Sequence, residues 1–435
     1  MKFNSITNNF SSGEWSPKMR ARTDVQQYAN ACEKMINFIP QIQGGAFRRP
    51  GTSRIVLSGA QDTDLQTVFS ASYPFQVRSK MIPRVLSDGT KQFLVCTNGQ
   101  PSTTWFVVNS NTPTTQYTVT VGTGANNTAT AASLKFVQIG DLVFIVDGTG
   151  ALPPRVWYGT SGGGGTLALL SDAYTAVSNP AGTRSILDTI YPFLPLNANG
   201  TSVTLTPSAT TGAITITASA NFFEATNIGS IFKFSSGGST GSAIITVYTN
   251  ATTVSATVLN TLPAAAAYGS AAGTSWEESS WSDRRGWPRT VTAHQGRIIY
   301  GGSTSYPDTI WGSRIGNVFD MMERPFEQDD AFTGYTDDNS RPFTLSPNTS
   351  LSSNIRVLTS DKTLIVLTDR SEIVGYGSSG ALGPNDVTFE SSTAYGANSP
   401  MAVKLGNFIL FVQKGGMKVR DIIFNFDQSQ YKSSD

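Results

Sequence analysis

A short plan of strands recurs five times along this chain, and it is the feature that most constrains the fold. Each copy has an apolar strand, a turn rich in Gly, Asp or Asn, a second apolar strand, a break at proline or glycine, and a third strand. The copies are Gln92–Thr97 with Thr104–Asn109, Leu134–Val146 with Arg155–Tyr158, Val291–Tyr300 with Thr309–Ser313, Ile355–Leu367 with Glu372–Gly377, and Val403–Val412 with Met417–Ile422. This is the plan of a β meander, the unit of a propeller blade. We therefore predict a mainly β fold with a propeller-like core of β-meander blades.

The distance between copies supports a propeller without excluding another β architecture. Several neighbouring copies lie about 45 to 65 residues apart, close to the blade lengths of propeller repeats. The copies share little sequence with one another. The same strand spacing also fits two unrelated β sandwiches.

Residues 161–275 differ in composition from the copies on either side. They open with SGGGG, hold only Arg184 and Lys233 as cations, and are rich in Thr, Ser, Ala and Gly. Short alternating strands are predicted at Ser202–Thr206, Ala213–Thr217, Ser230–Phe234, Ala243–Tyr248 and Thr253–Leu259. We predict a small β-barrel or sandwich domain inserted between the second and third copies.

The first residues of the chain predict a helix followed by turns. Thr23 and Gln26 fit a capping box, and apolar residues from Val25 to Ile39 fall at helical spacing up to Pro40, which ends the helix. Gly44 and Gly45 then allow a tight turn. Arg48 and Arg49 add two fixed charges, Pro50 and Gly51 a second turn, and Arg54–Leu57 reads as a strand.

The amino-acid sequence of this segment resembles that of a known family. FSSGEWSP at Phe10–Pro17, RARTD at Arg20–Asp24, then QQYANAC and NFIPQIQGGAFRRPG are similar to the amino-terminal signature of tail nozzle proteins, also called tail tubular or stabilisation proteins, of short-tailed double-stranded DNA bacteriophages. The resemblance continues in the segments 281–321, 364–377 and 405–422. Together the similar segments cover nearly half of the chain in the right order.

The resemblance implies a structural function and no catalytic one. Members of the family form a six-fold ring with a propeller-like β core around a DNA channel, below the adaptor ring of the portal. It implies a structural virion protein of the phage tail, assembled in the host cytoplasm, that lets DNA pass during ejection without sequence-specific binding. The expected partners are further copies of the chain, the portal-proximal adaptor, and tail fibres or spikes. The inserted domain is expected to face a neighbouring subunit, a fibre or the outer wall. The residues of this chain expected to dock on the adaptor are Arg22, Asp24, Arg48 and Arg49 as polar anchors and Phe38 and Ile39 as apolar anchors.

Composition agrees with a protein that has much of its surface against neighbours. Only 14% of the 435 residues are charged, against about a quarter in an average soluble domain. Two cysteines, Cys32 and Cys96, give no disulfide framework, so we expect both to be reduced. The start of the sequence has no signal-peptide apolar core, and no run approaches the ~18 apolar residues of a membrane span.

Charge is unevenly distributed along the chain. Residues 1–54 hold eight Lys or Arg and three acids, a net charge of +5, so the remainder carries −4 of the total of +1. A DNA-binding protein needs clustered cations, whereas a mildly acidic wall lets a polyanion pass. The pattern fits passage better than binding, although a charge balance without functional meaning explains it equally well.

Catalytic patterns are incomplete, and we predict no enzyme, no cofactor and no metal site. The single histidine, His294, excludes a cluster of imidazole ligands. GxSxG occurs at Gly159–Gly163 and Gly237–Gly241 without the strand, turn and helix of a nucleophile elbow. There is no phosphate-binding P-loop motif, and the acidic pair at 337–338 lacks the rest of a calcium loop. Carboxylates could still pair as in a glycosidase, for example Glu277 or Glu278 with Asp329 or Asp330.

Four tryptophans near residue 281 allow two interpretations. Trp276, Trp281, Trp287 and Trp311 lie close in the sequence to Arg284, Arg285 and Arg289. They could form a stacking platform for sugars or bases, or a blade core in which the arginines pair with acids. We favour the blade core.

We divide the chain into a docking arm with a short helix (1–60), the first blades (61–160), the inserted domain (161–275) and the later blades (276–435). We expect the blades to continue in a longer parent protein. A tail-displayed propeller that binds or cleaves host surface polysaccharide remains the alternative function. A host β-repeat adaptor is a third.

Overall fold

The computed structural model describes most of the chain, in two compact units. The described residues are 9–19, 24–41, 43–49, 79–98, 103–110, 112–122, 131–177, 190–194, 203–269, 274–321, 338–347, 353–378, 380–425 and 430–434. The amino-terminal unit is Met1–Val56 and the large unit is Leu57–Asp435. Each unit is a separate body and is described by itself.

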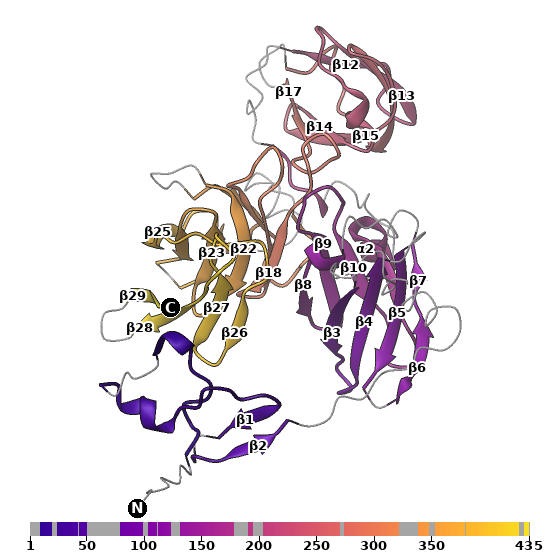
Figure 1. Ribbon diagram of the computed structural model, residues 1–435. Helices are drawn as coiled ribbons and strands as arrows, with labels where there is room; N and C mark the ends of the chain where they lie inside the picture. Colours follow the sequence, from indigo (N-terminus) through magenta and orange to yellow (C-terminus); the bar gives the residue numbers. More distant parts are fainter. Residues whose placement is uncertain are drawn as a thin grey trace, which may run out of the picture. The chain divides into compact units, whose positions relative to one another are not determined.

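Five antiparallel meanders form the frame of the large unit (Figure 1). The first sheet contains β3 (Ser79–Val85), β4 (Lys91–Asn98), β5 (Thr103–Asn109) and β6 (Thr112–Thr118), and the second contains β8 (Leu134–Ile139), β9 (Leu142–Asp147), β10 (Arg155–Tyr158) and β11 (Thr166–Leu169), with β7 (Thr120–Val121) parallel to β11. The third sheet contains β18 (Thr290–His294), β19 (Arg297–Gly301), β20 (Ile310–Gly312) and β21 (Phe343–Leu345), and the fourth contains β22 (Ile355–Ser360), β23 (Leu364–Thr368), β24 (Glu372–Tyr376) and β25 (Thr388–Thr393). The fifth sheet contains β26 (Val403–Leu405), β27 (Phe408–Val412), β28 (Val419–Asn425) and β29 (Gln430–Ser434). Each recurring copy in the sequence corresponds to one of these sheets.

Consecutive sheets are joined face to face by separate apolar layers. Ile82 and Leu94 of the first sheet pack with Val143 and Ile145 of β9. The alternate residues of the same strand, Phe144 and Val146, belong to the layer shared with the third sheet. Because successive side chains of a strand point to opposite faces, β9 contributes to two layers at once.

The fourth sheet repeats this arrangement. Leu364 and Val366 of β23 pack with the third sheet, and Ile365 and Leu367 pack with the fifth. Both faces of the strand are covered, so all five of its residues are buried and its sequence, LIVLT, has no polar alternation. Meander sheets stacked face to face in chain order define a mainly β, propeller-like core, as the sequence predicts.

A sixth sheet, within residues 205–278, has a core of its own. Its strands are β12 (Leu205–Pro207), β13 (Ala213–Ala218), β14 (Ile231–Ser236), β15 (Ser239–Asn250), β16 (Thr253–Asn260) and β17 (Thr274–Glu278), in the order β12-β13-β16-β15-β14-β17. The backbone of Leu205 at one edge exchanges hydrogen bonds with Tyr268. Trp276 of the other edge strand donates its indole N–H to the carbonyl of Val203. These contacts bring the two edges together, so the sheet is rolled into a barrel-like domain around Phe232, Phe234 and their neighbours.

Helical structure is sparse in the described part of the large unit. It comprises α2 (Leu170–Val177) and the 3-10 turns η3 (Ala131–Ser133), η4 (Ala225–Asn227) and η5 (Asp338–Ser340). Leu170 and Ala173 of α2 are buried in the layer between the second and third sheets. None of the helices in the described residues is long and apolar enough to cross a membrane.

The amino-terminal unit contains a two-stranded hairpin and two 3-10 turns. The turns are η1 (Pro17–Met19) and η2 (Gln26–Asn30), and the hairpin pairs β1 (Phe38–Pro40) with β2 (Ala46–Arg48). The predicted helix from Val25 to Ile39 is wrong, because helical backbone is limited to η2 and Ala31 is already extended. The predicted cap, Thr23, lies outside the described residues, as do Pro50, Gly51 and Arg54–Leu57.

Contacts with a distant segment explain why the helix ends early. The Cys32 N–H donates to the Gly13 carbonyl over 2.9 Å, and the Trp15 N–H donates to the Cys32 carbonyl over 3.0 Å. Asn37 has a left-handed backbone, with φ of 60°, and the chain bends there before β1. The apolar residues that fall at helical spacing after Ala31 therefore form no buried helix face, and Cys32 is not on a helix.

Candidate functional site

The β1–β2 hairpin presents the arginines and apolar residues that the sequence singles out. Its turn is closed by two hydrogen bonds. The Gln41 N–H donates to the Gly45 carbonyl over 2.7 Å, and the Gly44 N–H donates to the Gln41 carbonyl over 2.9 Å. Gly44 has φ of +103°, and a Cβ there would lie 3.1 Å from Asn9. The predicted tight turn at Gly44 and Gly45 is therefore confirmed, and Gly44 is the residue that requires glycine.

The register gives the hairpin two different faces. Phe38 is opposite Arg48, and Ile39 is opposite Phe47. The Arg49 N–H donates to the Asn37 carbonyl over 2.7 Å, which extends the ladder by one residue. Opposite residues share a face, so Phe38 and Arg48 lie on one face, while Ile39, Phe47 and Arg49 lie on the other.

Both faces are accessible within the amino-terminal unit. Phe38 is 51% exposed and Phe47 is 43% exposed, and Arg48 and Arg49 are exposed as well. Among the described residues neither guanidinium forms an ion pair. Exposed aromatic side chains beside unpaired arginines are the residue types enriched at protein–protein interfaces.

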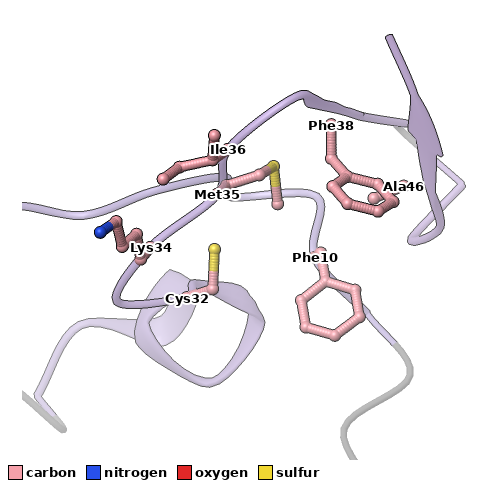
Figure 2. Close-up of a pocket in the computed structure, with 7 residues that line it drawn as sticks. All are labelled: Phe10, Cys32, Lys34, Met35, Ile36, Phe38 and Ala46. Atoms are coloured by element: carbon pink, nitrogen blue, oxygen red, sulfur yellow. The ribbon is translucent and has the colours of Figure 1, made fainter.

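A pocket of about 540 Å³ adjoins the Phe38 face (Figure 2). Figure 2 shows Met35 and the thiol of Cys32 pointing toward the space between Phe10 and Phe38, with Ala46 beside Phe38. Lys34 and Ile36 complete the lining. The pocket is mainly apolar with one cation at its margin, which suits an apolar side chain of a partner better than a polar metabolite.

The segment FSSGEWSP holds the pocket together. The Glu14 carboxylate accepts the Met35 N–H over 2.7 Å, and the Cys32 thiol donates to the Gly13 carbonyl over 3.3 Å. Trp15 packs edge-on against Tyr28, with ring centroids 6.2 Å apart. The role of Glu14 was not predicted from the sequence. No local pattern identifies it, because its partner Met35 lies 21 residues further along the chain.

The structure brings together four of the six predicted docking residues. Phe38, Ile39, Arg48 and Arg49 belong to one hairpin, though Arg48 and Arg49 lie on opposite faces of it. Asp24 is exposed just before η2, and its contribution to the same surface stays a prediction. Arg22 lies outside the described residues.

The glutamates considered for catalysis are held in ion pairs. Glu277 pairs with Lys233, and the buried Glu278 pairs with Arg285 and accepts the Asn227 amide over 3.2 Å. The Lys233–Glu277 pair joins the neighbouring strands β14 and β17, and the Glu278–Arg285 pair joins β17 to the segment that follows it. Their proposed partners, Asp329 and Asp330, lie outside the described residues.

The other catalytic patterns have structural explanations. His294 is buried, its Nδ1 lies 2.8 Å from the Ser360 hydroxyl, and burial followed by the charge of Arg297 lowers its pKa to about 4. One GxSxG lies in the loop after β10, and the other spans the β14–β15 turn, where Ser239 begins a strand and not a helix. No group of three potential metal ligands occurs in the part of the chain that the structure describes.

The tryptophans form core, as the sequence favours. Trp281, Trp287 and Trp311 are buried together, and Trp281 packs edge-on against Trp311 with centroids 5.5 Å apart. Trp276 belongs instead to the barrel-like domain. Both Arg284 and Arg285 pair with Glu278, so the prediction of arginines paired with acids is confirmed for these two.

Comparison with known proteins adds little to this description. No family model matches the chain, and no curated protein matches it. A putative 6-phosphogluconolactonase from Bacteroides fragilis NCTC 9343 is 9% identical, with a TM-score of 0.33 over 81% of this chain and 82% of that one. The endosialidase of phage phi92 is 10% identical, with a TM-score of 0.24 over 81% and 51%. A putative 6-phosphogluconolactonase from Bacteroides uniformis ATCC 8492 is 10% identical, with a TM-score of 0.28 over 82% and 81%. At such TM-scores these likenesses carry no argument, and the fold class rests on the chain's own sheets.

Proposed function

We propose that this chain is a structural subunit of a phage tail nozzle. Copies of it form a ring, six by family resemblance, which docks below the portal adaptor and surrounds the channel for DNA ejection. The proposal rests on the resemblance of the amino-terminal sequence to that of tail nozzle proteins. The observation that supports it most directly is the hairpin, which belongs to a separate compact unit and carries two exposed aromatic residues and two exposed arginines that form no ion pair with any described residue.

The chemistry of the described residues also supports a structural role over an enzymatic one. The histidine is buried and held neutral by its low pKa, and Glu277 and Glu278 are neutralised by basic side chains. Of the indole rings considered as a stacking platform, Trp281, Trp287 and Trp311 are buried in a core, and the half-buried Trp276 packs against another. A polysaccharide-degrading propeller would need free carboxylates and accessible rings at one site.

The fifth sheet offers a surface for contact with another copy. One face, with Ile409 and Phe411, is covered by the fourth sheet. The other face exposes apolar side chains among the described residues, with Leu405 at 64% and Val419 at 59%. Exposed apolar faces of this kind are typical of surfaces that pack against another polypeptide.

The hairpin arginines provide the first test. Replacing Arg48 and Arg49 together by alanine removes two exposed charges and should leave the free energy of unfolding within about 0.5 kcal/mol. The full-length variant should fail to join particles that lack this protein, as judged by electron microscopy of the tail and by pull-down with the purified adaptor. A matched variant, with Lys91→Ala and Lys414→Ala, should join normally because both lysines are exposed on the large unit.

Normal incorporation of the arginine variant would refute the docking role of the hairpin. A purified chain that stays monomeric at every concentration and releases oligosaccharide from host surface polysaccharide would refute the structural role altogether. Testing Arg48→Ala and Arg49→Ala singly then shows which face of the hairpin meets the adaptor.

A further inference from the structure

A second pocket, of about 570 Å³, lies in the large unit among strands of the first, second and fifth meanders. It is lined by Lys80 and Met81 of β3, by residues 133–136 at the start of β8, by Gly148 and Thr149, and by the segment 399–403. Sequence reasoning did not single out any of these residues, because they are far apart in the chain.

Lys135 is the unusual member of this pocket. It is only 4% exposed, and its ammonium donates to the backbone carbonyl of Arg356. A lysine ammonium has three N–H donors, so this hydrogen bond leaves two for other acceptors. A buried ammonium with a single acceptor is costly unless further acceptors or a negative charge satisfy it.

The charges around Lys135 are mostly of its own sign. Burial, followed by the neighbouring charges of Arg356, Arg289 and Lys80, lowers the pKa of Lys135 to about 7, and Asp147 alone opposes this shift. Burial also lowers the pKa of Lys80. The pocket therefore concentrates positive potential that the surrounding protein does not neutralise.

The nearby carboxylates are already engaged. Asp147 accepts the Ser133 hydroxyl over 2.7 Å and the Thr149 N–H over 3.2 Å. Asp369 lies 3.9 Å from the Arg356 guanidinium and also accepts the Asn354 N–H over 2.9 Å. Lys135 and Lys80 line the pocket, none of its described lining residues is a carboxylate, and Arg289 and Arg356 add positive charge near Lys135; this excess of positive charge suits a dianion.

We propose that this pocket binds a phosphate-type dianion carried by a small molecule, held by the ammonium groups of Lys135 and Lys80. Oxygen atoms of the phosphate accept hydrogen bonds from the spare N–H groups of Lys135, and the negative charge of the phosphate offsets the positive charges that act on Lys135. A small molecule is favoured over the phosphates of duplex DNA, because the nearly complete burial of Lys135 keeps a rigid duplex from reaching it.

Calorimetric titration of the full-length chain with inorganic phosphate and with sulfate tests the site. Sulfate is included because its charge does not change between pH 6.5 and pH 8.5. Saturable binding of both anions is expected, and sulfate should bind several-fold more tightly at pH 6.5, where Lys135 is mostly protonated, than at pH 8.5. Lys135→Met keeps the length of the side chain without its charge and should weaken binding at least tenfold and abolish this pH dependence.

Two further variants keep the test decisive. Lys80→Met should also weaken anion binding at least tenfold, and it serves if Lys135→Met does not fold. Lys91→Met, which removes an exposed lysine of β4, should bind as the unaltered protein does. The proposal is overturned by an absence of saturable binding, by unchanged affinity in both pocket variants, or by binding of a short DNA duplex without binding of the free anions.

Discussion

At the scale of single residues, burial decides what the ionisable groups of this chain can do. His294 and Lys135 are both nearly buried, and in both burial favours the neutral form. Glu278 is equally buried and forms an ion pair with Arg285. The sequence shows which residues are ionisable, whereas their charge depends on neighbours as distant as residue 356, which no local pattern identifies.

His294 makes stability depend on pH in a defined window. Its pKa is about 4 in the folded chain and about 6.5 when unfolded, so between these values the unfolded chain binds a proton that the folded chain does not. The free energy of unfolding should therefore fall as the pH drops from 6.5 to 4, by roughly 3 kcal/mol from this residue. Denaturant unfolding of His294→Gln and the unaltered protein at pH 7, 5.5 and 4.5 measures this.

The control compares the two proteins at each pH, because carboxylates contribute equally to both. His294→Gln keeps a side chain able to hydrogen-bond Ser360 and should lose less stability on acidification. Parallel pH dependence in the two proteins would contradict the assignment of His294 as a neutral, buried group.

At the scale of elements, apolar strands were predictable both inside the sheets and at their margins, and polar margin strands were not. The predicted segments cover the inner strands β4, β9 and β23 and also the edge strands β8, β18 and β22. The outermost strands β6, β25 and β29 were missed, since TPTTQYT, TFESST and QYKSS have no apolar alternation to indicate a strand. They are specified by hydrogen bonding to a neighbouring strand, which is a tertiary effect.

The incorrect helix has a related cause. Apolar residues between Val25 and Ile39 fall at helical spacing, but the spacing does not show whether a core exists to receive them. In the structure Cys32 pairs with the Gly13–Trp15 segment instead. Of the candidate docking surface, the exposed arginines and the Gly44 turn were predictable, while the Glu14 contact and the pocket were not, because they depend on pairing between distant segments.

The hairpin turn provides a prediction at this scale. Gly44→Ala introduces a Cβ at φ of +103°, close to Asn9, and should destabilise the hairpin by about 1–3 kcal/mol. The amides of Gly44 and Arg49 should then exchange hydrogen roughly tenfold faster or more, while the β3–β4 turn amide of Leu86 is unaffected. Hydrogen exchange with mass spectrometry measures both in one sample.

Gly45→Ala is the matched control. Gly45 has no left-handed backbone, and a Cβ there would meet only the end of the Gln41 side chain at 3.5 Å. Exchange in the hairpin should stay unchanged or become slower in this variant. Equal effects of the two substitutions would show that the turn does not depend on the conformation of Gly44.

At the scale of the whole molecule, the stacking of meanders explains where apolar surface is left over. Each interior sheet is covered on both faces by its neighbours in the chain, as β9 and β23 show. The fifth sheet is covered on one face only within the described residues, and Val403, Leu405, Phe408 and Val419 lie on the other. The fold class was predictable because the recurring strand pattern reflects pairing between strands that are close in the sequence. The exposure of one face of the fifth sheet was not predictable, because it depends on how all the sheets pack together.

The uncovered face gives the last prediction, which depends on the proposed ring. Leu405→Glu with Val419→Glu places two carboxylates on that face, where burial against another copy would cost several kcal/mol each. Because both side chains are exposed in the single chain, the free energy of unfolding should change by less than about 1 kcal/mol. Ring formation, followed by sedimentation velocity and electron microscopy, should require at least tenfold more protein or be lost. Thr388→Glu, on the exposed and polar strand β25, should assemble normally. If the double variant forms rings as readily as the unaltered chain, copies do not meet through the fifth sheet, and the subunit contacts of the nozzle lie elsewhere.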